Sequence, residues 1–143
     1  MEFKKCGVGN KIFGEPQPDN DMDKLQLTYD EPGMIYSSKD AIRKAIIAGE
    51  TTMGKALEKF FVSMAVNHTA MVEGDNVTNF EYSAQSPDEL ALIKGAKSVG
   101  VVYSKRTARF ITIQVGGKER EYEIMHEIPF DSDRKRMSLL VKN

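Results

Sequence analysis

The spacing of apolar residues predicts two helices in the first half of the chain. Apolar side chains recur every three or four positions over residues 38–47 and again over residues 55–67, which is the spacing of one helix face. Gly49 stands just after the first segment, where a glycine commonly ends a helix. We expect both helices to place their apolar stripe in a hydrophobic core.

A short hairpin and a long connection precede these helices. Residues 3–8 and 11–13 flank Gly9-Asn10, a pair that suits the positive φ angles of a tight turn. Residues 14–37 then combine prolines and acidic side chains with few apolar ones. This composition predicts an acidic connecting loop.

A third helix has a strong start signal in Ser86-Pro87-Asp88-Glu89. Serine suits the N-cap, proline suits the first helical position, and Glu89 stands at the capping-box position. The apolar residues 90–93 continue the pattern, and the helix is expected to end near Gly100.

Beyond this helix the apolar period changes from that of a helix to that of a strand. Ile111, Ile113 and Val115 alternate with polar residues, and Gly116-Gly117 provides a two-residue turn. Tyr122, Ile124 and Ile128 then alternate with glutamates in a second strand.

Two further strands and two further turns complete the predicted elements. The strands are residues 80–83 and 137–141, and the turns are residues 73–76 and the charged stretch 131–136. The expected fold class is therefore α+β, with an antiparallel β-sheet flanked by helices.

Composition narrows the function classes. The 143 residues are 41% hydrophobic and 29% charged, which suits one soluble domain over residues 1–143. Twenty Lys and Arg against 21 Asp and Glu leave a formal charge of −1, so we expect neither nucleic-acid binding nor direct membrane contact. No apolar run approaches the roughly 20 residues of a membrane helix. Cys6 with two histidines is a poor metal set, and we expect no metal site.

The common catalytic and phosphate-binding motifs are absent from the sequence. It contains no P-loop, no Gly-x-Gly-x-x-Gly and no familiar Ser/His/Asp spacing. Two glycosylation sequons, at Asn67 and Asn76, have no secretory signal to deliver them. His68 is expected to be a hydrogen-bonded structural histidine.

Two longer stretches carry more information together than either does alone. Residues 82–92 read Tyr-Ser-Ala-Gln-Ser-Pro-Asp-Glu-Leu-Ala-Leu, and residues 128–138 read Ile-Pro-Phe-Asp-Ser-Asp-Arg-Lys-Arg-Met-Ser. Each alone is explained as a helix cap or a solvated turn. In this order they resemble the nucleotide-binding domain of the type IV P-type ATPases, the phospholipid flippases, and weaker resemblance extends over nearly the whole chain.

The resemblance implies a nucleotide-binding set. Glu89 would face the adenine amino group, Phe130 would stack on the adenine ring, and Lys135 would line the pocket. Asp88 and Ser132, in the same two motifs, complete the set. An adenine does need an aromatic face, a hydrogen-bond acceptor and nearby cations for its phosphates. The residues alone leave open whether Glu89 serves the helix cap or adenine.

The family's other parts lie outside this chain. The phosphorylated aspartate would precede Met1, so we expect no catalytic residue here and no ATP hydrolysis by the chain alone. The implied ligands are ATP and Mg²⁺, the latter held mainly by absent domains. The implied partners are the remaining domains of the parent ATPase and, through its membrane part, an accessory β-subunit.

The expected role is that of an ATP-binding module in the cytosolic part of an integral membrane protein. It would position ATP for phosphoryl transfer to an aspartate elsewhere in a phospholipid-translocating enzyme. We also expect the domain to be truncated at its C-terminal side. The alternative is a diverged scaffold that acts as a protein-interaction module without binding nucleotide.

Overall fold

The computed structural model describes residues 1–9, 11–14, 39–73 and 81–143. Their contacts form two compact units, one of residues 4–60 and one of residues 1–3 with 61–143. The single domain over residues 1–143 stays a prediction. No helix within the described residues is long and apolar enough to cross a membrane.

The unit of residues 4–60 contains the predicted opening hairpin. Strand β1 (Lys5–Val8) pairs antiparallel with β2 (Lys11–Gly14), which confirms the hairpin. Its turn residue Asn10 lies outside the described residues. So does the predicted acidic loop, apart from Gly14, which ends β2.

The two predicted helices are also confirmed. Helix α2 (Lys39–Ala48) ends where expected, at Gly49, whose φ is +62° and whose N–H donates to the Ala45 carbonyl. Helix α3 (Thr52–Val66) begins three residues before the predicted start. It does so because the Thr51 hydroxyl oxygen accepts a hydrogen bond from Gly54 N–H at 2.9 Å and so caps the first turn.

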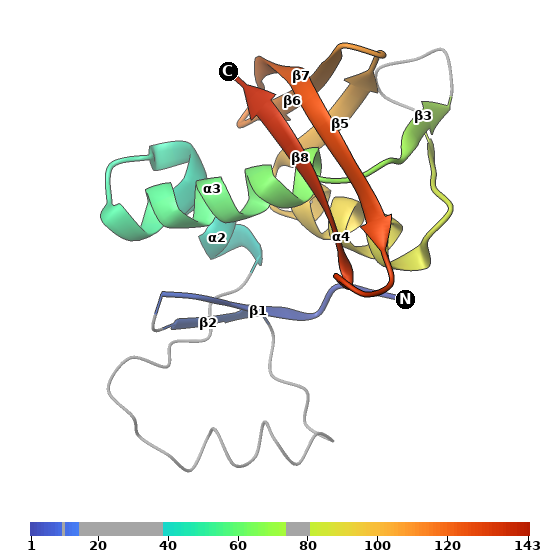
Figure 1. The fold of residues 1–143 in the computed structure, drawn as a ribbon. Coiled ribbons are helices and arrows are strands. Elements are labelled where there is room, and N and C mark those ends of the chain that lie inside the picture. Colours follow the sequence, from blue (N-terminus) through green and yellow to red (C-terminus); the bar gives the residue numbers. More distant parts are fainter. Residues whose placement is uncertain (10, 15–38, 74–80) are drawn as a thin grey trace, which may run out of the picture. The chain divides into compact units, whose positions relative to one another are not determined.

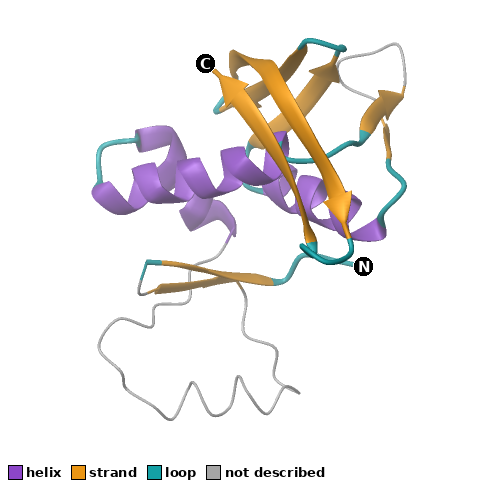
Figure 2. Ribbon diagram, viewed as in Figure 1, coloured by secondary structure: helices purple, strands orange, loops and turns teal. Residues whose placement is uncertain are grey.

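The unit of residues 61–143 is built on an antiparallel sheet of four strands in the order β5-β6-β7-β8 (Figure 1). The strands are β5 (Val101–Arg106), β6 (Phe110–Val115), β7 (Lys118–Asp131) and β8 (Arg136–Lys142). A separate two-stranded sheet pairs β3 (Met71–Glu73) with β4 (Glu81–Ser83), and α4 (Pro87–Ser98) precedes β5 (Figure 2). The α+β class with an antiparallel sheet is confirmed.

Sequence patterns missed two strands. Strand β5 begins with three consecutive apolar residues, Val101, Val102 and Tyr103, so apolar and polar residues do not alternate there. The burial does alternate, because Val101 and Tyr103 are buried and Val102 is not. Strand β3 has only three residues, and its last one, Glu73, was predicted in a turn. That placement of Glu73 was wrong because the residue pairs with Glu81 across β3 and β4. The rest of that turn and Phe80 lie outside the described residues.

The core of this unit lies between the end of α3, helix α4 and one face of the sheet. Its buried apolar side chains are Phe61, Ala65, Val66, Ala70, Ala91, Ile93, Ala96, Val99, Val101, Tyr103, Ile111, Ile113 and Val115. The predicted turn Gly116-Gly117 joins β6 to β7 with φ angles of 56° and 82°, which favour glycine. The turn pairs Val115 with Lys118 and so keeps the apolar face of β6 toward the core.

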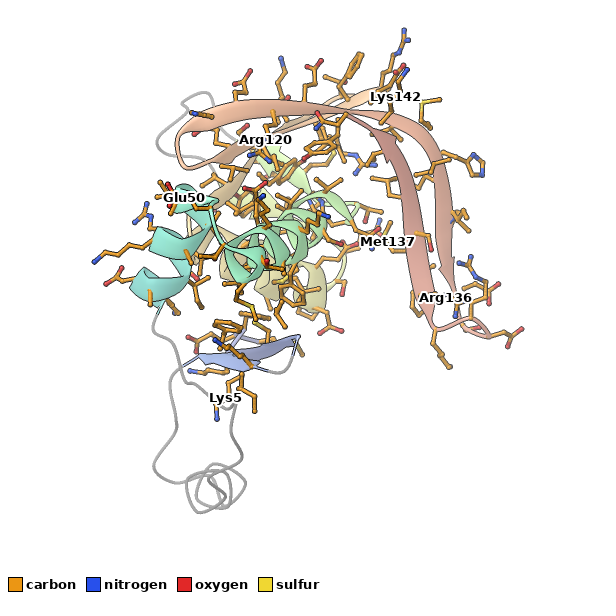
Figure 3. All side chains as sticks on the ribbon, turned by 90° about the vertical axis from the view of Figure 1, so that its left-hand side faces the viewer. Lys5, Glu50, Arg120, Arg136, Met137 and Lys142 are labelled. Carbon is orange, nitrogen blue, oxygen red and sulfur yellow. The ribbon has the colours of Figure 1, made fainter. Side chains whose placement is uncertain are left out.

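The far half of the β7–β8 hairpin does not follow the predicted alternation. Ile128 was expected on the buried face with Ile124, but it is 39% exposed. The pairing shifts by one residue between Ile124 and His126, and every residue of β7 from Met125 onward is exposed, so neither face of this part of the strand is buried. Figure 3 shows Arg136 at the far end of this hairpin.

Ile113 provides a test of the core. It is 0% exposed, whereas Leu140 on the projecting hairpin is 62% exposed. We expect Ile113→Ala to lower the free energy of unfolding by about 2–5 kcal/mol, because it leaves a cavity in the sheet–helix interface. The control Leu140→Ala should change it by less than about 0.5 kcal/mol. Urea denaturation of both variants measures the difference, and equal losses would contradict this core.

Candidate functional site

Helix α4 positions Asp88 and Glu89 in its first turn. Ser86 is the N-cap with extended backbone angles, its hydroxyl oxygen accepts from Asp88 N–H at 3.2 Å, and Pro87 is the first helical residue. The predicted start of α4 is therefore confirmed. Acidic side chains are common in the first turn of a helix, next to the partial positive charge of its N-terminus.

The Glu89 carboxylate does not complete the predicted capping box. It turns to Thr69, whose backbone N–H donates to Oε1 at 3.0 Å. The Thr69 hydroxyl lies 3.1 Å from Oε2 and 3.3 Å from Oε1. Of the roles that the sequence left open for Glu89, the helix cap is therefore not the one adopted, because Thr69, 20 positions before Glu89, offers two donors at one place.

The segment that presents Thr69 is held on both sides. The His68 carbonyl accepts from Arg106 Nη1 at 2.6 Å, and the Ala70 carbonyl accepts from the Tyr103 hydroxyl at 2.8 Å. Burial raises the pKa of Tyr103 to about 12, so this hydroxyl remains a donor at neutral pH. Both donors belong to β5, which therefore fixes the backbone around Thr69.

Arg106 extends the same network to the base of the hairpin. Its Nη2 makes an ion pair with Glu127 Oε2 at 2.8 Å. Only 11% of the Arg106 side chain is exposed, whereas the Glu127 side chain is 37% exposed, so water reaches the pair from the Glu127 side. One guanidinium thus joins the chain at His68 to β7.

The chain forms a turn at the end of the β7–β8 hairpin. One carboxylate oxygen of Asp131 accepts from Asp133 N–H at 2.7 Å and from Arg134 N–H at 3.0 Å. These bonds hold the pKa of Asp131 below its ordinary value. The Asp131 carbonyl also accepts from Lys135 N–H, and Lys135 has a φ of 56°. The charged turn predicted over residues 131–136 is confirmed.

The three cations of this turn differ in their partners. Arg134 donates to the Ser138 hydroxyl, and Arg136 donates to the Arg134 carbonyl, each at 3.3 Å. Within residues 81–143 and the other described segments, the Lys135 side chain makes no hydrogen bond or ion pair. Its ammonium is thus available to an anion.

Phe130 and Ser132 stand beside the same turn and are exposed. The Phe130 ring is 66% exposed, a high value for an aromatic side chain in a sheet. The structure therefore brings Phe130, Ser132 and Lys135 together at one end of the hairpin.

Asp88 and Glu89 come from α4, a different element of the same unit. No hydrogen bond or ion pair links their side chains to the hairpin end among the described residues. The same residues contain no group of three His, Cys, Asp or Glu side chains suited to a metal ion.

Sequence reasoning missed Thr69 and Arg106 as neighbours of the site. Each contacts residues 20 or more positions away, and neither stands in a motif with recognisable spacing. Only the pairing of elements in space reveals their roles.

Comparison with known proteins identifies the family. A sequence model described as P-type ATPase, cytoplasmic domain N matches residues 56–143, and the chain belongs to this family. It is 34% identical to the human phospholipid-transporting ATPase IC over 146 residues, and 31% identical to the human probable phospholipid-transporting ATPase IM over 150 residues. A phospholipid-transporting ATPase of Schizosaccharomyces pombe is 30% identical over 149 residues.

These alignments cover 99–100% of this chain but only 11–12% of each relative. The chain therefore spans a small part of the proteins that it matches. The recognition of a phospholipid-ATPase nucleotide-binding domain from residues 82–92 and 128–138 is confirmed.

His68 precedes Thr69 in the chain, and its predicted role as a hydrogen-bonded structural histidine is confirmed. The ring is 1% exposed, and Nε2 lies 2.9 Å from the Ala65 carbonyl oxygen. Burial lowers the pKa of His68 from 6.5 to about 4, and Arg106 acts in the same direction. The ring is therefore neutral at pH 7.

This lowered pKa makes stability depend on pH. In the unfolded chain His68 has the ordinary pKa of 6.5, whereas in the folded chain its pKa is about 4. Between these two pH values the unfolded chain therefore binds more protons than the folded chain. The contribution of His68 to the free energy of unfolding should be at its maximum above pH 6.5, and it should fall by roughly 3 kcal/mol as the pH decreases from 6.5 to 4. Denaturation at a series of pH values should show a flatter profile for His68→Gln than for the wild type or His126→Gln. Parallel profiles for all three would contradict the assignment.

Proposed function

We propose that this chain is the ATP-binding module of a phospholipid-transporting P-type ATPase. The observation that carries the proposal is membership of the domain N family over residues 56–143, with three phospholipid-transporting ATPases as relatives. Phosphoryl transfer depends mainly on positioning and electrostatic stabilisation. The task of the module is to hold ATP with its γ-phosphate directed at an aspartate on another domain.

The adenine end of the proposed site uses one aromatic ring and one carboxylate. Phe130 offers an exposed ring face, on which a purine stacks. Glu89 offers carboxylate oxygens that only accept hydrogen bonds, which suits the amino group of adenine. Asp88 stands next to it in the first turn of α4.

The phosphate end uses the hairpin turn. Lys135 is a cation without a partner in the described structure, and Ser132 adds a hydroxyl in the same turn. A single ammonium neutralises only part of the charge of a triphosphate, so we expect weak binding by this chain. Mg²⁺ would arrive with ATP, its remaining ligands coming from other domains.

The parent protein would hydrolyse ATP through an aspartyl-phosphate and move phospholipid between membrane leaflets. This chain would be a cytosolic domain of that membrane protein, and an accessory β-subunit would contact the membrane part. None of the catalytic residues would belong to residues 1–143. If the chain were only an interaction module, nucleotide would cause no saturable change in its spectrum.

Phe130 gives the first test of ATP binding. ATP titrated into the ¹⁵N-labelled chain should shift amide resonances of α4 and of the hairpin end in a saturable way. Phe130→Ala should weaken ATP binding by roughly 1–3 kcal/mol, about 5- to 150-fold, since the stacking face is lost. Leu140→Ala removes an equally exposed side chain from the same hairpin and serves as the control. Unfolding by Phe130→Ala, or its loss of affinity matched by Leu140→Ala, would contradict this site.

Lys135 gives a second test, directed at the phosphates. Lys135→Glu should weaken ATP more than adenosine, because it replaces attraction to the phosphates with repulsion. Arg134→Glu is the matched control, since Arg134 is bonded to Ser138. Titrations of both variants with both ligands measure the effect. Equal losses for the two charge reversals would indicate a diffuse field and remove Lys135 from the site.

A further inference from the structure

Glu89 is held by one residue through both of its carboxylate oxygens. Thr69 N–H donates to Oε1, and the single hydroxyl proton of Thr69 is shared between Oε1 and Oε2, at 3.3 and 3.1 Å. This arrangement limits rotation about the end of the Glu89 side chain. Glutamate otherwise loses considerable rotamer freedom when a ligand orders it.

Thr69 is itself a rigid support. The carbonyls on either side of it accept from Arg106 and from Tyr103, and the residues before and after it, His68 and Ala70, are buried. The threonine side chain is exposed although the backbone that carries it is anchored in the core. A carboxylate fixed to such a support has a defined direction before any ligand arrives.

The remaining acceptor capacity of Glu89 determines what it can recognise. An ionised carboxylate has about four lone-pair positions and no donor. Oε1 already accepts the backbone N–H, whereas Oε2 shares only the hydroxyl proton. Oε2 is therefore the better acceptor for an incoming donor, and an incoming acceptor would meet repulsion.

We infer that Thr69 is the positioning residue that makes Glu89 selective for adenine over 6-oxopurines. This inference rests on the proposed ATP site. Adenine presents an amino donor at C6, whereas guanine and hypoxanthine present a carbonyl acceptor at the same place. A site built to accept a hydrogen bond rejects an analogue that lacks the donor, and the rejection depends on how firmly the acceptor is held.

The experiment compares ATP with inosine triphosphate, which differs from it at C6 of the purine by one carbonyl in place of the amino group. Both are titrated into the 143-residue chain and followed by amide resonances. The wild type should prefer ATP. Thr69→Val should lose about three- to tenfold of that preference, the size expected when one hydrogen bond of typical net strength is removed. Thr69→Ser keeps the hydroxyl and should retain the preference.

Two further variants complete the design. Glu89→Gln should abolish the preference, because a carboxamide can donate to the 6-carbonyl as well as accept from the 6-amino group. Thr52→Val makes the same substitution at an exposed position of the other unit and should change nothing. Amide spectra without ligand establish that each variant remains folded.

The outcomes separate the inference from the proposed function. If the wild type binds neither nucleotide, the ATP site fails and the inference fails with it. If the wild type prefers ATP and Thr69→Val keeps the full preference, the ATP site stands and the role of Thr69 is overturned. A uniform loss of both nucleotides in Thr69→Val, with the ratio unchanged, assigns Thr69 a merely structural role and also overturns the inference.

Discussion

The hydrogen bonds that β5 makes to the segment after α3 are the constraint on which the candidate site depends. Arg106 and Tyr103 occupy the carbonyls of His68 and Ala70, and this leaves Thr69 between them with its N–H and hydroxyl free to bind Glu89. Breaking either β5 contact would leave a carbonyl unsatisfied next to the core. The direction of the Glu89 carboxylate thus depends on residues that would not touch the ligand.

The hairpin end follows a different principle. Its turn is held by Asp131 and by local backbone bonds, while Phe130 and Lys135 remain exposed and without partners in the described structure. The site therefore combines a carboxylate that is fixed before binding with an aromatic ring and a cation that stand on a projecting element. Among the described residues, this hairpin is joined to the rest of the unit by the pairing of β7 with β6 and by the ion pairs of Glu123 with Arg109 and of Glu127 with Arg106.

Much of the fold was predictable because its signals are local. The cap at Ser86, the turn at Gly116-Gly117 and the end of α2 at Gly49 each depend on residues within a few positions of one another. Strand β5 was missed because Val102, on the less buried face between Val101 and Tyr103, is apolar too, so the sequence does not alternate where the burial does. Ile128 was misplaced because the alternation of apolar residues continues along β7 beyond the part of the strand that the core covers.

The sequence by itself determined the family, the helix start that carries Asp88 and Glu89, and the short stretch that carries Phe130, Ser132 and Lys135. Each of these could be recognised because its signal lies in residues that are contiguous in the chain. Tertiary structure alone decided that Glu89 binds Thr69 and not its own helix cap, and that Arg106 joins His68 to Glu127. Which of several competing donors a carboxylate binds depends on how close each donor lies to it in space. That distance is set by how α4, β5 and the segment of residues 67–70 pack, and no local pattern of residues contains it.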